Sequence, residues 1–574
     1  MKDYIYFQMR AYLYPKEESQ IVQFKLNELE KLWYCSQKNV KRRLKKFSDA
    51  GKIIYIPGKG RGNPSEMKFS FAFQEEIERK VLEFIQQDQL ESIVSLLQLP
   101  IPKTWIANVS KEVQNLFGFQ QSNQSKDFLR TIITRSLTTI DPIYASVTFE
   151  TYLIRQLGDS LVTYNQELDL VEPHIAHHWE ENQSKIWVFY LRKGVRFHNR
   201  NILTSKDVKY TLERFQINSS PHSWLVEDIE KIECVSPYIL RITLKRSNPM
   251  FLRYLSSHNL VILPVNEHFD EKKWIGTGPF QMKKRTDTLL VLSAFDDYFL
   301  SRPLLDEVEF YRVPIETTVT YGVDNPNGNR DGYLEQKEVE VGFRFVAFNF
   351  MKNTIVHDKF FREALYHLMD MNRLWKDLNR SNLNEASSYF FWKSKQLSKD
   401  TEKVISLLKK SKYCGEMISL YALEKPTYLE EAKWLQNEAQ KAGINIEITA
   451  FNLEEFYDPL LEKADLLLMG EVASTDYHVS FIGAFLNKAL IFNLFFTEKQ
   501  LMELNVYFEK IKQVGSAKER EVWIDAAERY IRKENLFLYL YHPVKHQTFH
   551  PMIKDIEFES FGYVDLRKLW INNI

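Results

Sequence analysis

The sequence predicts a multidomain α/β protein with a small basic domain at its front and a larger body behind it. Its 574 residues are too many for one hydrophobic core and allow two to four domains. The stretch 31–70 holds eleven Lys and Arg against two acidic residues, although the whole chain has no net charge. From about residue 128 onward, short strand and helix patterns alternate, which is typical of a mixed α/β body with two lobes.

The front of the chain predicts helices followed by a hairpin. Ser36 can cap a basic helix whose inward face is Val40, Leu44 and Phe47, and Gly51 follows its end. The strands "KIIYIP" and "SEMKFSFAF" then flank the glycine-rich turn "GKGRGNP". A helix, a turn, a basic helix and a basic-tipped hairpin together predict a winged helix-turn-helix domain that binds double-stranded DNA.

The basic side chains of this domain point away from its predicted core. At about 100° per residue, they fall opposite or beside the apolar face of the helix. We expect Lys38, Lys41 and Arg42 to reach base edges in the groove and the other basic residues to contact phosphates. The predicted DNA-binding residues are Ser36, Lys38, Asn39, Lys41, Arg42, Lys45, Lys46, Lys59 and Arg61. The alternatives are a solvated helix face and a phosphate loop at "GKGRG", which lacks the GK[ST] ending.

The next segments predict a helical extension and a connector. The stretch 75–98 is amphipathic at helical spacing, and "LPIPKTW" at 99–105 carries two prolines that are typical of a connector. The predicted domains are the winged helix domain at 1–73, a helical extension and linker at 74–125, and the two-lobed body at 126–574.

The body contains several clear helix and strand patterns. "SKDVKYTLERF" predicts a helix capped by Ser205, and "YLEEAKWLQNEAQKAGINIEITAF" predicts a helix closed by Gly443 and followed by a strand. "HDKFFREALYHLMDMNRL" predicts one helix. Its expected inward residues are Phe360, Ala364, Leu365 and Leu368.

The composition indicates a cytoplasmic protein. Cys35, Cys234 and Cys414 are widely separated and odd in number, which suits a reducing compartment. The first residues lack the apolar core of an export signal, and no run of about 18 apolar residues indicates a membrane span. We expect no membrane partner.

The sequence gives no reason to expect an enzyme or a cofactor. It has no G-x-S-x-G, no HExxH and no Walker loop, and "SEMK" falls in a predicted wing strand. The triplet His174, His177 and His178 in "HIAHH" offers a metal cluster as an alternative, but it lacks a cysteine at ligand spacing. We therefore predict no catalytic and no metal-binding residues.

The body resembles the family 5 extracellular solute-binding proteins, which are the oligopeptide, dipeptide and nickel receptors of ABC importers. The resemblance begins at 171–215, with a Pro-x-x-Ala-x-x-Trp run at Pro173–Trp179, then "LRKGVRFH" and "DV". "GTGPF", "VAFNFMKN", "KAGINIEI" and "ENLFLYLYHP" follow in the family's order. The resemblance implies a two-lobed periplasmic-binding-protein-like module of type II.

Together with the winged helix, this module resembles the SgrR-type transcriptional regulators. Their front domain also carries a "CS-basic-NV" helix start and a "GRG" wing, here at 35–40 and 60–62. The resemblance implies a DNA-binding regulator that senses a small solute, which could be sugar-, peptide- or metabolite-like. The alternative is the substrate-binding component of an oligopeptide- or nickel-type ABC transporter, and a homodimer is left open.

The chain departs from the importer pattern at two positions. Arg200 stands where the family's "FH-x-G" turn usually has glycine. Ser474 stands where peptide receptors carry an Asp for the ligand's α-amine, and Asp476 lies two residues further on. We predict ligand contacts from polar or aromatic residues near family-like lobe or hinge segments. They are Tyr144, Trp224, Asn349, Trp392, Ser474 and Asp476.

Overall fold

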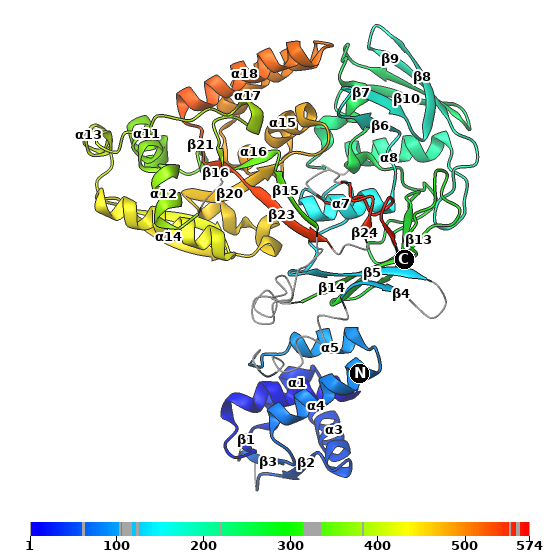
Figure 1. Ribbon diagram of the computed structural model, residues 1–574, viewed down its shortest axis with the longest axis vertical. Helices are drawn as coiled ribbons and strands as arrows, with labels where there is room; N and C mark the ends of the chain where they lie inside the picture. The colour runs from blue at the N-terminus through cyan, green and yellow to red at the C-terminus, as the bar shows by residue number, and fades with distance from the viewer. Residues whose placement is uncertain are drawn as a thin grey trace. The chain divides into compact units, whose positions relative to one another are not determined.

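Figure 1 shows the computed structural model of the chain. The described residues are 2–59, 63–102, 105, 117–121, 126–217, 220–313, 334–380, 384–549, 553–557 and 563–572. The chain divides into two compact units. Unit 1 comprises Met1–Ser136, Lys283–Leu292 and Leu305–Gly332, and unit 2 comprises Leu137–Met282, Ser293–Leu304 and Tyr333–Ile574.

Unit 1 begins with a winged helix domain (Figure 1). Its elements are α1 (Lys2–Leu13), η1 (Tyr14–Lys16), β1 (Ile21–Phe24), α2 (Leu26–Trp33), α3 (Gln37–Asp49), β2 (Ile53–Ile56) and β3 (Ser65–Phe69). The three strands pair antiparallel in the order β1-β3-β2. As predicted, α3 begins after Ser36, and Gly51 beyond its end has φ +68°, the left-handed conformation that glycine adopts easily.

The predicted apolar face of α3 forms part of the core of this domain. Val40 and Leu44 are fully buried, and they share the core with Leu29 and Trp33 of α2. Phe47 is half-buried and packs edge-on against Tyr6 of α1, with ring centroids 5.3 Å apart. Because α3 packs into the domain through Val40, Leu44 and Phe47, its opposite, basic side faces solvent.

The helical extension forms two helices, α4 (Phe73–Gln86) and α5 (Leu90–Leu97), because the chain breaks at Asp88, which has φ +50°. The segment 99–105 is predicted to be a connector, and its described residues 99–102 have no regular structure, as the two prolines indicate. Leu99 and Trp105 are nevertheless buried in the core of unit 1, and Trp105 packs edge-on against Tyr14 and Phe73.

The helix α5 packs on a five-stranded sheet whose order is β12-β13-β14-β5-β4. The strands are β4 (Gly118–Gln121), β5 (Asp127–Ile133), β12 (Phe280–Arg285), β13 (Leu289–Ala294) and β14 (Glu307–Arg312). Leu289, Val291 and Tyr311 of this sheet belong to the same core as the winged helix domain. β14 is parallel to β5.

The first part of unit 2 is built on an antiparallel sheet with the order β10-β11-β9-β8. Its strands are β8 (Ala176–Asn182), β9 (Ile186–Leu191), β10 (Ile229–Ser236) and β11 (Ile239–Leu244), beside the hairpin β6 (Val162–Asn165) and β7 (Leu170–Pro173). Its helices are α7 (Thr148–Leu157), α8 (Ser205–Ile217), η3 (Ser223–Leu225), α9 (Phe251–Tyr254) and η4 (His258–Leu260).

The second part of unit 2 is a mixed sheet, β19-β18-β20-β16-β21, with helices around it (Figure 1). Its strands are β16 (Gly342–Phe348), β18 (Met417–Leu423), β19 (Asn445–Phe451), β20 (Leu466–Val472) and β21 (Phe537–Tyr539). Its helices are α11 (Lys359–Leu368), α12 (Met371–Asp377), α13 (Lys403–Lys410), α14 (Pro426–Lys441), α15 (Tyr477–Leu486), α16 (Ile491–Phe495), α17 (Glu498–Lys512) and α18 (Ala517–Glu534). Shorter pieces are η5 (Ile355–His357), η6 (Phe391–Lys393), η7 (Leu453–Tyr457) and η8 (Pro459–Lys463). Two-stranded pairs join β15 (Leu334–Val339) to β23 (Val544–Phe549), β17 (Asn384–Glu385) to β22 (Tyr541–His542), and β24 (Ile553–Lys554) to β25 (Trp570–Ile571).

Most of the helices predicted for the body are confirmed, and two details are corrected. Ser205 was predicted to cap α8, but it is the first residue of the helix and its Oγ donates to the Ser236 carbonyl, while the Thr204 carbonyl accepts from the N–H groups of Asp207 and Val208. The helix expected at 357–374 is two helices, because α11 ends at Leu368 and the Asp370 side chain caps α12. Phe360 was predicted to face inward, but it is 43% exposed and Phe361 is fully buried in its place. The expected residues Ala364, Leu365 and Leu368 are buried.

Arg200 takes a left-handed backbone conformation at the turn where the sequence lacks the expected glycine. Its φ is +68°, which costs a residue with a Cβ atom about 1–2 kcal/mol. The tight turn is therefore kept without the residue that best fits it.

One stretch, Tyr477–Phe495, is long and apolar enough to cross a membrane. It spans α15 and α16, and most of it is buried. Phe481, Phe485 and Phe492 belong to the main core of unit 2, which accounts for the apolar composition of these helices.

Candidate DNA-binding surface and ligand cavity

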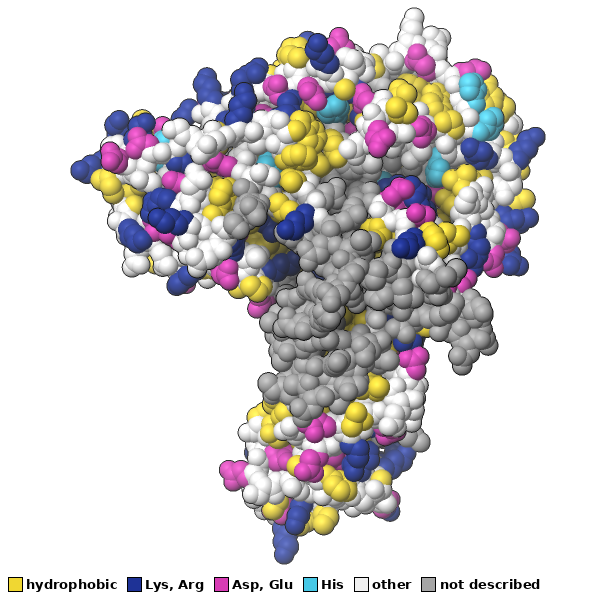
Figure 2. All heavy atoms as spheres, in the orientation of Figure 1, with side chains coloured by type: hydrophobic (Ala, Val, Ile, Leu, Met, Phe, Trp, Pro, Cys, Tyr) yellow, Lys and Arg dark blue, Asp and Glu magenta, His cyan; other side chains and the backbone are white. Residues whose placement is uncertain are grey.

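The helix α3 presents a row of basic side chains on its exposed side. Five Lys and Arg side chains are exposed: Lys38, Lys41, Arg42, Lys45 and Lys46. Ser36 caps the helix through its backbone, since its carbonyl accepts from the N–H groups of Asn39 and Val40, and its side chain makes no capping hydrogen bond. Asn39 is half-buried. Figure 2 shows Lys and Arg side chains on the surface of this part of the molecule. The arrangement suits a polyanion such as DNA.

The hairpin β2–β3 forms the wing. Its register pairs Ile53 with Phe69 and Ile56 with Glu66. Lys59 lies beyond the end of β2 and is exposed, whereas Arg61 lies outside the described residues. The predicted phosphate contacts at the wing tip remain predictions.

Sequence reasoning missed one residue beside α3. Tyr34 lies in the turn between α2 and α3, has φ +46° and is 96% exposed. An aromatic ring held in the open next to a basic helix can stack on a base or a sugar. The sequence feature that could have pointed to Tyr34 is its position directly before Cys35 and Ser36, at the start of the basic helix.

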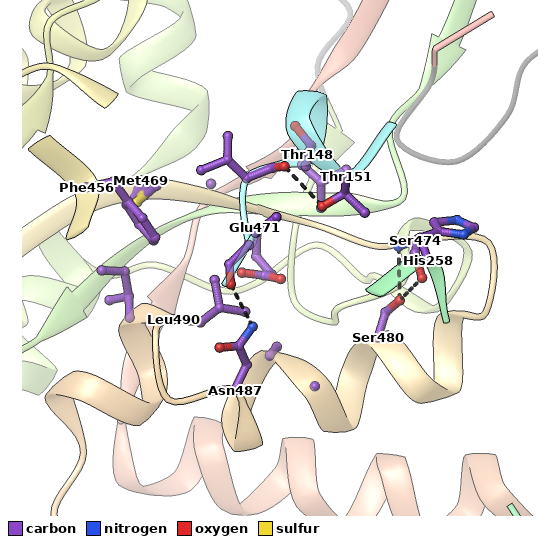
Figure 3. Close-up of a pocket in the computed structure, with 18 of the residues that line it drawn as sticks. Thr148, Thr151, His258, Phe456, Met469, Glu471, Ser474, Ser480, Asn487 and Leu490 are labelled. Atoms are coloured by element: carbon purple, nitrogen blue, oxygen red, sulfur yellow. Dashed lines mark hydrogen bonds between the residues drawn. The ribbon is translucent and has the colours of Figure 1, made fainter. Parts of the chain in front are cut away.

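Unit 2 contains a cavity of about 390 Å³ (Figure 3). The first part of the unit contributes Ala145–Thr148, Thr151, His222, Trp224, Leu225 and Ser257–Asn259. The second part contributes Glu340, Arg344, Phe345, Leu423, Lys425, Tyr428, Leu453, Phe456, Met469–Val472, Ser474, Val479, Ser480, Gly483, Ala484, Asn487, Leu490, Ile491, Lys545 and Tyr563. A cavity of this size between two lobes can hold a small organic ligand.

Most neutral polar groups in the wall are hydrogen-bonded within the protein. The His222 Nε2 lies 2.9 Å from the Ala145 carbonyl oxygen, and burial lowers the pKa of His222 to about 4, so the ring is neutral. The Asn487 amide donates to the Ser146 Oγ over 3.1 Å. The hydroxyls of Ser474 and Ser480 are 2.8 Å apart (Figure 3).

The charged groups in the wall differ in their surroundings. Glu340 is paired with Lys545 over 2.7 Å. The Arg344 guanidinium lies 3.8 Å from the centroid of the Tyr428 ring, and its buried Nε has no hydrogen-bond partner. Glu471 is different, because burial alone raises the pKa of its carboxyl, to about 8.

The structure brings two of the six predicted ligand residues into this cavity. Trp224 and Ser474 line it. Asp476 is instead a buried structural residue, because the Arg253 Nε and Nη2 donate to its two oxygens over 2.7 and 2.8 Å. Asn349 is also engaged elsewhere, since its amide donates to the carbonyls of Glu462 and Ala464.

Tyr144 and Trp392 are not among the residues that line the cavity. Tyr144 is 42% exposed, and Trp392 is 48% exposed and packs against Tyr477 with ring centroids 5.4 Å apart. Position in a family-like segment did not distinguish residues that line the cavity from residues next to them in sequence. A ligand contact from these four residues stays a prediction.

One histidine of the triplet, His174, has a structural role. The His174 Nε2 lies 2.8 Å from the Asp159 carboxylate. His177 and His178 lie on β8. Within the described ranges, no group of three or more His, Cys, Asp and Glu side chains is placed to hold a metal ion.

Comparisons with known proteins match both parts of the chain. Residues 171–491, more than half of the chain, match the family "Bacterial extracellular solute-binding proteins, family 5 Middle". Residues 6–119 match the family "Sugar transport-related sRNA regulator N-term".

Two relatives match the chain almost from end to end. The uncharacterized protein YhjP of Bacillus subtilis (strain 168) is 27% identical over 97% of both chains. The HTH-type transcriptional regulator SgrR of Photorhabdus laumondii is 24% identical over 95% of both chains. The SgrR of Salmonella typhimurium is 29% identical over 50% of this chain and 51% of its own.

Solved structures share the fold of the body. A dipeptide binding protein from Pseudoalteromonas sp. SM9913, in complex with Met-Leu, superposes with a TM-score of 0.68 at 19% identity. It covers 78% of this chain and 100% of its own. NikZ from Campylobacter jejuni, in complex with Ni(L-His), superposes with a TM-score of 0.64 at 18% identity and covers 77% and 99%. The chain therefore belongs to the family 5 solute-binding proteins, in the SgrR-type arrangement that places a regulator N-terminal domain before the solute-binding module.

Proposed function

We propose that this protein is a cytoplasmic transcriptional regulator that binds double-stranded DNA and senses a small solute. The observation that carries the proposal is the pairing of two sites in one chain. The winged helix domain exposes five basic side chains on α3, and unit 2 holds a cavity lined from both of its parts. A transport receptor needs only the second of these sites.

The basic residues have distinct roles in this proposal. Lys38, Lys41 and Arg42, in the first half of α3, contact base edges in the major groove. The other basic residues and the wing contact phosphates. Ser36 and Asn39 sit at the start of α3, where backbone N–H groups approach a phosphate.

Solute binding would act by favouring one arrangement of the parts that line the cavity. A ligand shifts such an equilibrium only as far as it binds one state better than the other. Within unit 1, α5 packs on the sheet of β5 and β14, so the winged helix domain is packed against strands rather than held by a bare linker.

A DNA-binding assay tests the proposal. Full-length protein is titrated against genomic fragments in an electrophoretic shift assay, at several salt concentrations. With about five phosphates neutralised, log K against log salt falls with a slope near −4.5. The double variant Arg42→Ala/Lys59→Ala is expected to lose binding, while Lys409→Ala/Lys410→Ala, which removes two exposed charges from α13, keeps it.

The outcomes separate the regulator from the transport receptor. Absence of salt-sensitive DNA binding, or equal binding by the two double variants, contradicts the proposal. If solute binding persists in that case, the alternative of a transport receptor is favoured.

A further inference from the structure

The turn between α2 and α3 holds a tyrosine in a backbone conformation that suits glycine. Tyr34 follows the last residue of α2 and has φ +46° and ψ +47°, which is the left-handed region. A residue with a Cβ atom adopts this region at a cost in free energy, and the turn of a helix-turn-helix often contains glycine. The Tyr34 backbone N–H donates to the Lys31 carbonyl oxygen over 3.4 Å and closes α2. The turn therefore needs this backbone conformation but not the tyrosine side chain.

The side chain of Tyr34 is left almost entirely in water. It is 96% exposed, whereas Tyr12, the next most exposed tyrosine of the winged helix domain, is 41% exposed. Trp33, one position earlier, is buried, and the Arg43 guanidinium lies 5.1 Å from its ring centroid. Among the described residues, no hydrogen bond or ring contact engages the Tyr34 side chain. Packing within the domain therefore does not account for this residue.

Tyr34 stands beside the end of α3 that carries the proposed base contacts. Ser36, the N-cap of α3, is two residues further on, and Lys38 and Lys41 follow on the exposed side of the helix. In a helix-turn-helix domain the N-terminal residues of the second helix enter the major groove. A side chain in the turn before that helix meets the edge of the groove, where the sugar-phosphate backbone lies.

Double-stranded DNA offers the Tyr34 ring a sugar rather than the face of a base. The faces of paired bases are already stacked, and a ring can cover one only if the duplex is unstacked. The deoxyribose at the groove edge is accessible without such a distortion. Removing an aromatic ring from water against this sugar is favourable, and the gain does not depend on the release of counterions.

We propose that Tyr34 is a DNA-contacting residue whose ring packs against a deoxyribose at the edge of the major groove. The proposal rests on the proposed function, because it requires that α3 binds duplex DNA. The contact adds affinity without an ion pair, and it gives the exposed tyrosine in the left-handed turn a role. A thymine methyl group is the competing partner in the groove.

The experiment measures the affinity of full-length variants for one genomic fragment that the unmodified protein binds. Tyr34→Ala is expected to bind about tenfold more weakly, with an unchanged slope of log K against log salt. Tyr34→Phe keeps the ring and is expected to restore most of this affinity. Lys45→Ala, which removes a proposed phosphate contact, is expected instead to reduce the slope by about one. Tyr12→Ala removes another exposed ring of the same domain and is the matched control, with no expected effect on binding.

Tyr34→Asn separates a DNA contact from a structural role. Asparagine adopts the left-handed conformation more easily than tyrosine does. The variant is therefore expected to have a higher melting temperature than the unmodified protein, and yet to bind DNA about tenfold more weakly. A residue kept for the fold would lower the melting temperature when it is replaced.

A second form of the fragment identifies the group that the ring contacts. Amplification with dUTP in place of dTTP removes every thymine methyl group and leaves the sugars unchanged. The affinity lost by Tyr34→Ala is expected to be the same on both forms of the fragment.

Three results would overturn the inference. They are equal binding by Tyr34→Ala and the unmodified protein, a lower melting temperature of Tyr34→Asn, and a loss of affinity that disappears on the fragment without thymine methyl groups. Failure of the proposed function looks different, because the unmodified protein would then show no salt-sensitive binding to DNA. If the unmodified protein binds and Tyr34→Ala binds equally well, the inference about Tyr34 fails alone.

Discussion

Arg130 on β5 holds the carboxylate of Asp88 with both terminal nitrogens of its guanidinium group. The Nη1–Oδ1 and Nη2–Oδ2 distances are 2.9 and 3.0 Å, and the Nε donates to Glu309 of β14 over 3.0 Å. Asp88 lies in the turn between α4 and α5, so one side chain of the sheet binds the helical extension of the winged helix domain. This fork is a specific polar contact within unit 1, in addition to its apolar core.

Replacing Arg130 is expected to weaken the packing of α4 and α5 on the sheet of unit 1. Arg130→Met keeps the apolar stem but leaves Asp88 and Glu309 without their shared cation, at a position only 8% exposed. We expect a loss of about 1–2 kcal/mol in the stability of unit 1, because Arg130 and Glu309 are largely buried whereas the Asp88 side chain is 61% exposed and its pair is weakened by solvent. Thermal unfolding and hydrogen exchange of α4 and α5 measure it.

The control for this change is an exposed ion pair at the start of α13. Lys403→Met removes the partner of Asp400, whose side chain is 38% exposed, and such exposed pairs contribute at most about 0.5 kcal/mol. If the two substitutions lowered stability equally, the contacts of Arg130 with Asp88 and Glu309 would contribute no more than a surface ion pair.

The stability of the protein is expected to respond to pH through Glu471. The folded pKa is raised to about 8, whereas an unfolded glutamate titrates near its ordinary value of 4.5. Between these two values the folded state holds a proton that the unfolded state has released. Stability from this group is therefore fully present below about pH 4.5 and is lost as the pH rises to about 8.

Glu471→Gln isolates this contribution, because glutamine resembles the protonated acid and does not ionise. We expect the variant and the unmodified protein to melt together near pH 5, and the variant to melt at a higher temperature at pH 9. Thermal unfolding across this range measures the difference. A constant gap between the two proteins at every pH would show that Glu471 has an ordinary pKa.

Arg200→Gly is expected to stabilise the protein. The backbone at Arg200 has φ +68°, and glycine adopts this conformation without the Cβ clash. The substitution gives up the exposed ion pair with Asp297, which is 3.2 Å away and contributes little. The expected gain is about 1 kcal/mol, measured as a higher midpoint of denaturation.

A glycine at the next position tests whether the gain comes from the positive φ of Arg200. Asn201 is exposed and is not among the described residues with positive φ, so Asn201→Gly is expected to lower stability slightly. A gain from Asn201→Gly as well would show that general flexibility, not the turn, is the cause.

The sequence allowed elements with strong local signals to be predicted. The helix α3 has a capping serine, a three-residue apolar seam and a closing glycine, and its limits were predicted closely. β1 was missed because it has four residues and only Val22 and Phe24 face inward. The break at Asp88 was missed because the apolar pattern of 75–98 continues through it at nearly helical spacing.

The cavity was harder to predict, because its wall comes from segments far apart in the chain. Trp224 and Ser474 were named for their residue type and their place in family-like segments, and both line it. Glu471 was passed over because an isolated glutamate at a strand end is usually solvated, and only tertiary structure shows that it lacks a cation. Asp476 was chosen because it is acidic, but Arg253 is supplied by a helix 223 positions away in sequence.

Asp476→Asn tests whether this residue is structural. The buried Asp476 accepts two hydrogen bonds from Arg253 and caps α15 through the N–H groups of His478 and Val479. Asparagine can keep the cap but not the ion pair, so we expect a loss of about 2–4 kcal/mol. Asp370→Asn is the matched control, because Asp370 caps α12 in the same way and no arginine holds it among the described contacts; its expected cost is near zero. Full stability of Asp476→Asn would contradict the structural role and would return Asp476 to the candidate ligand residues.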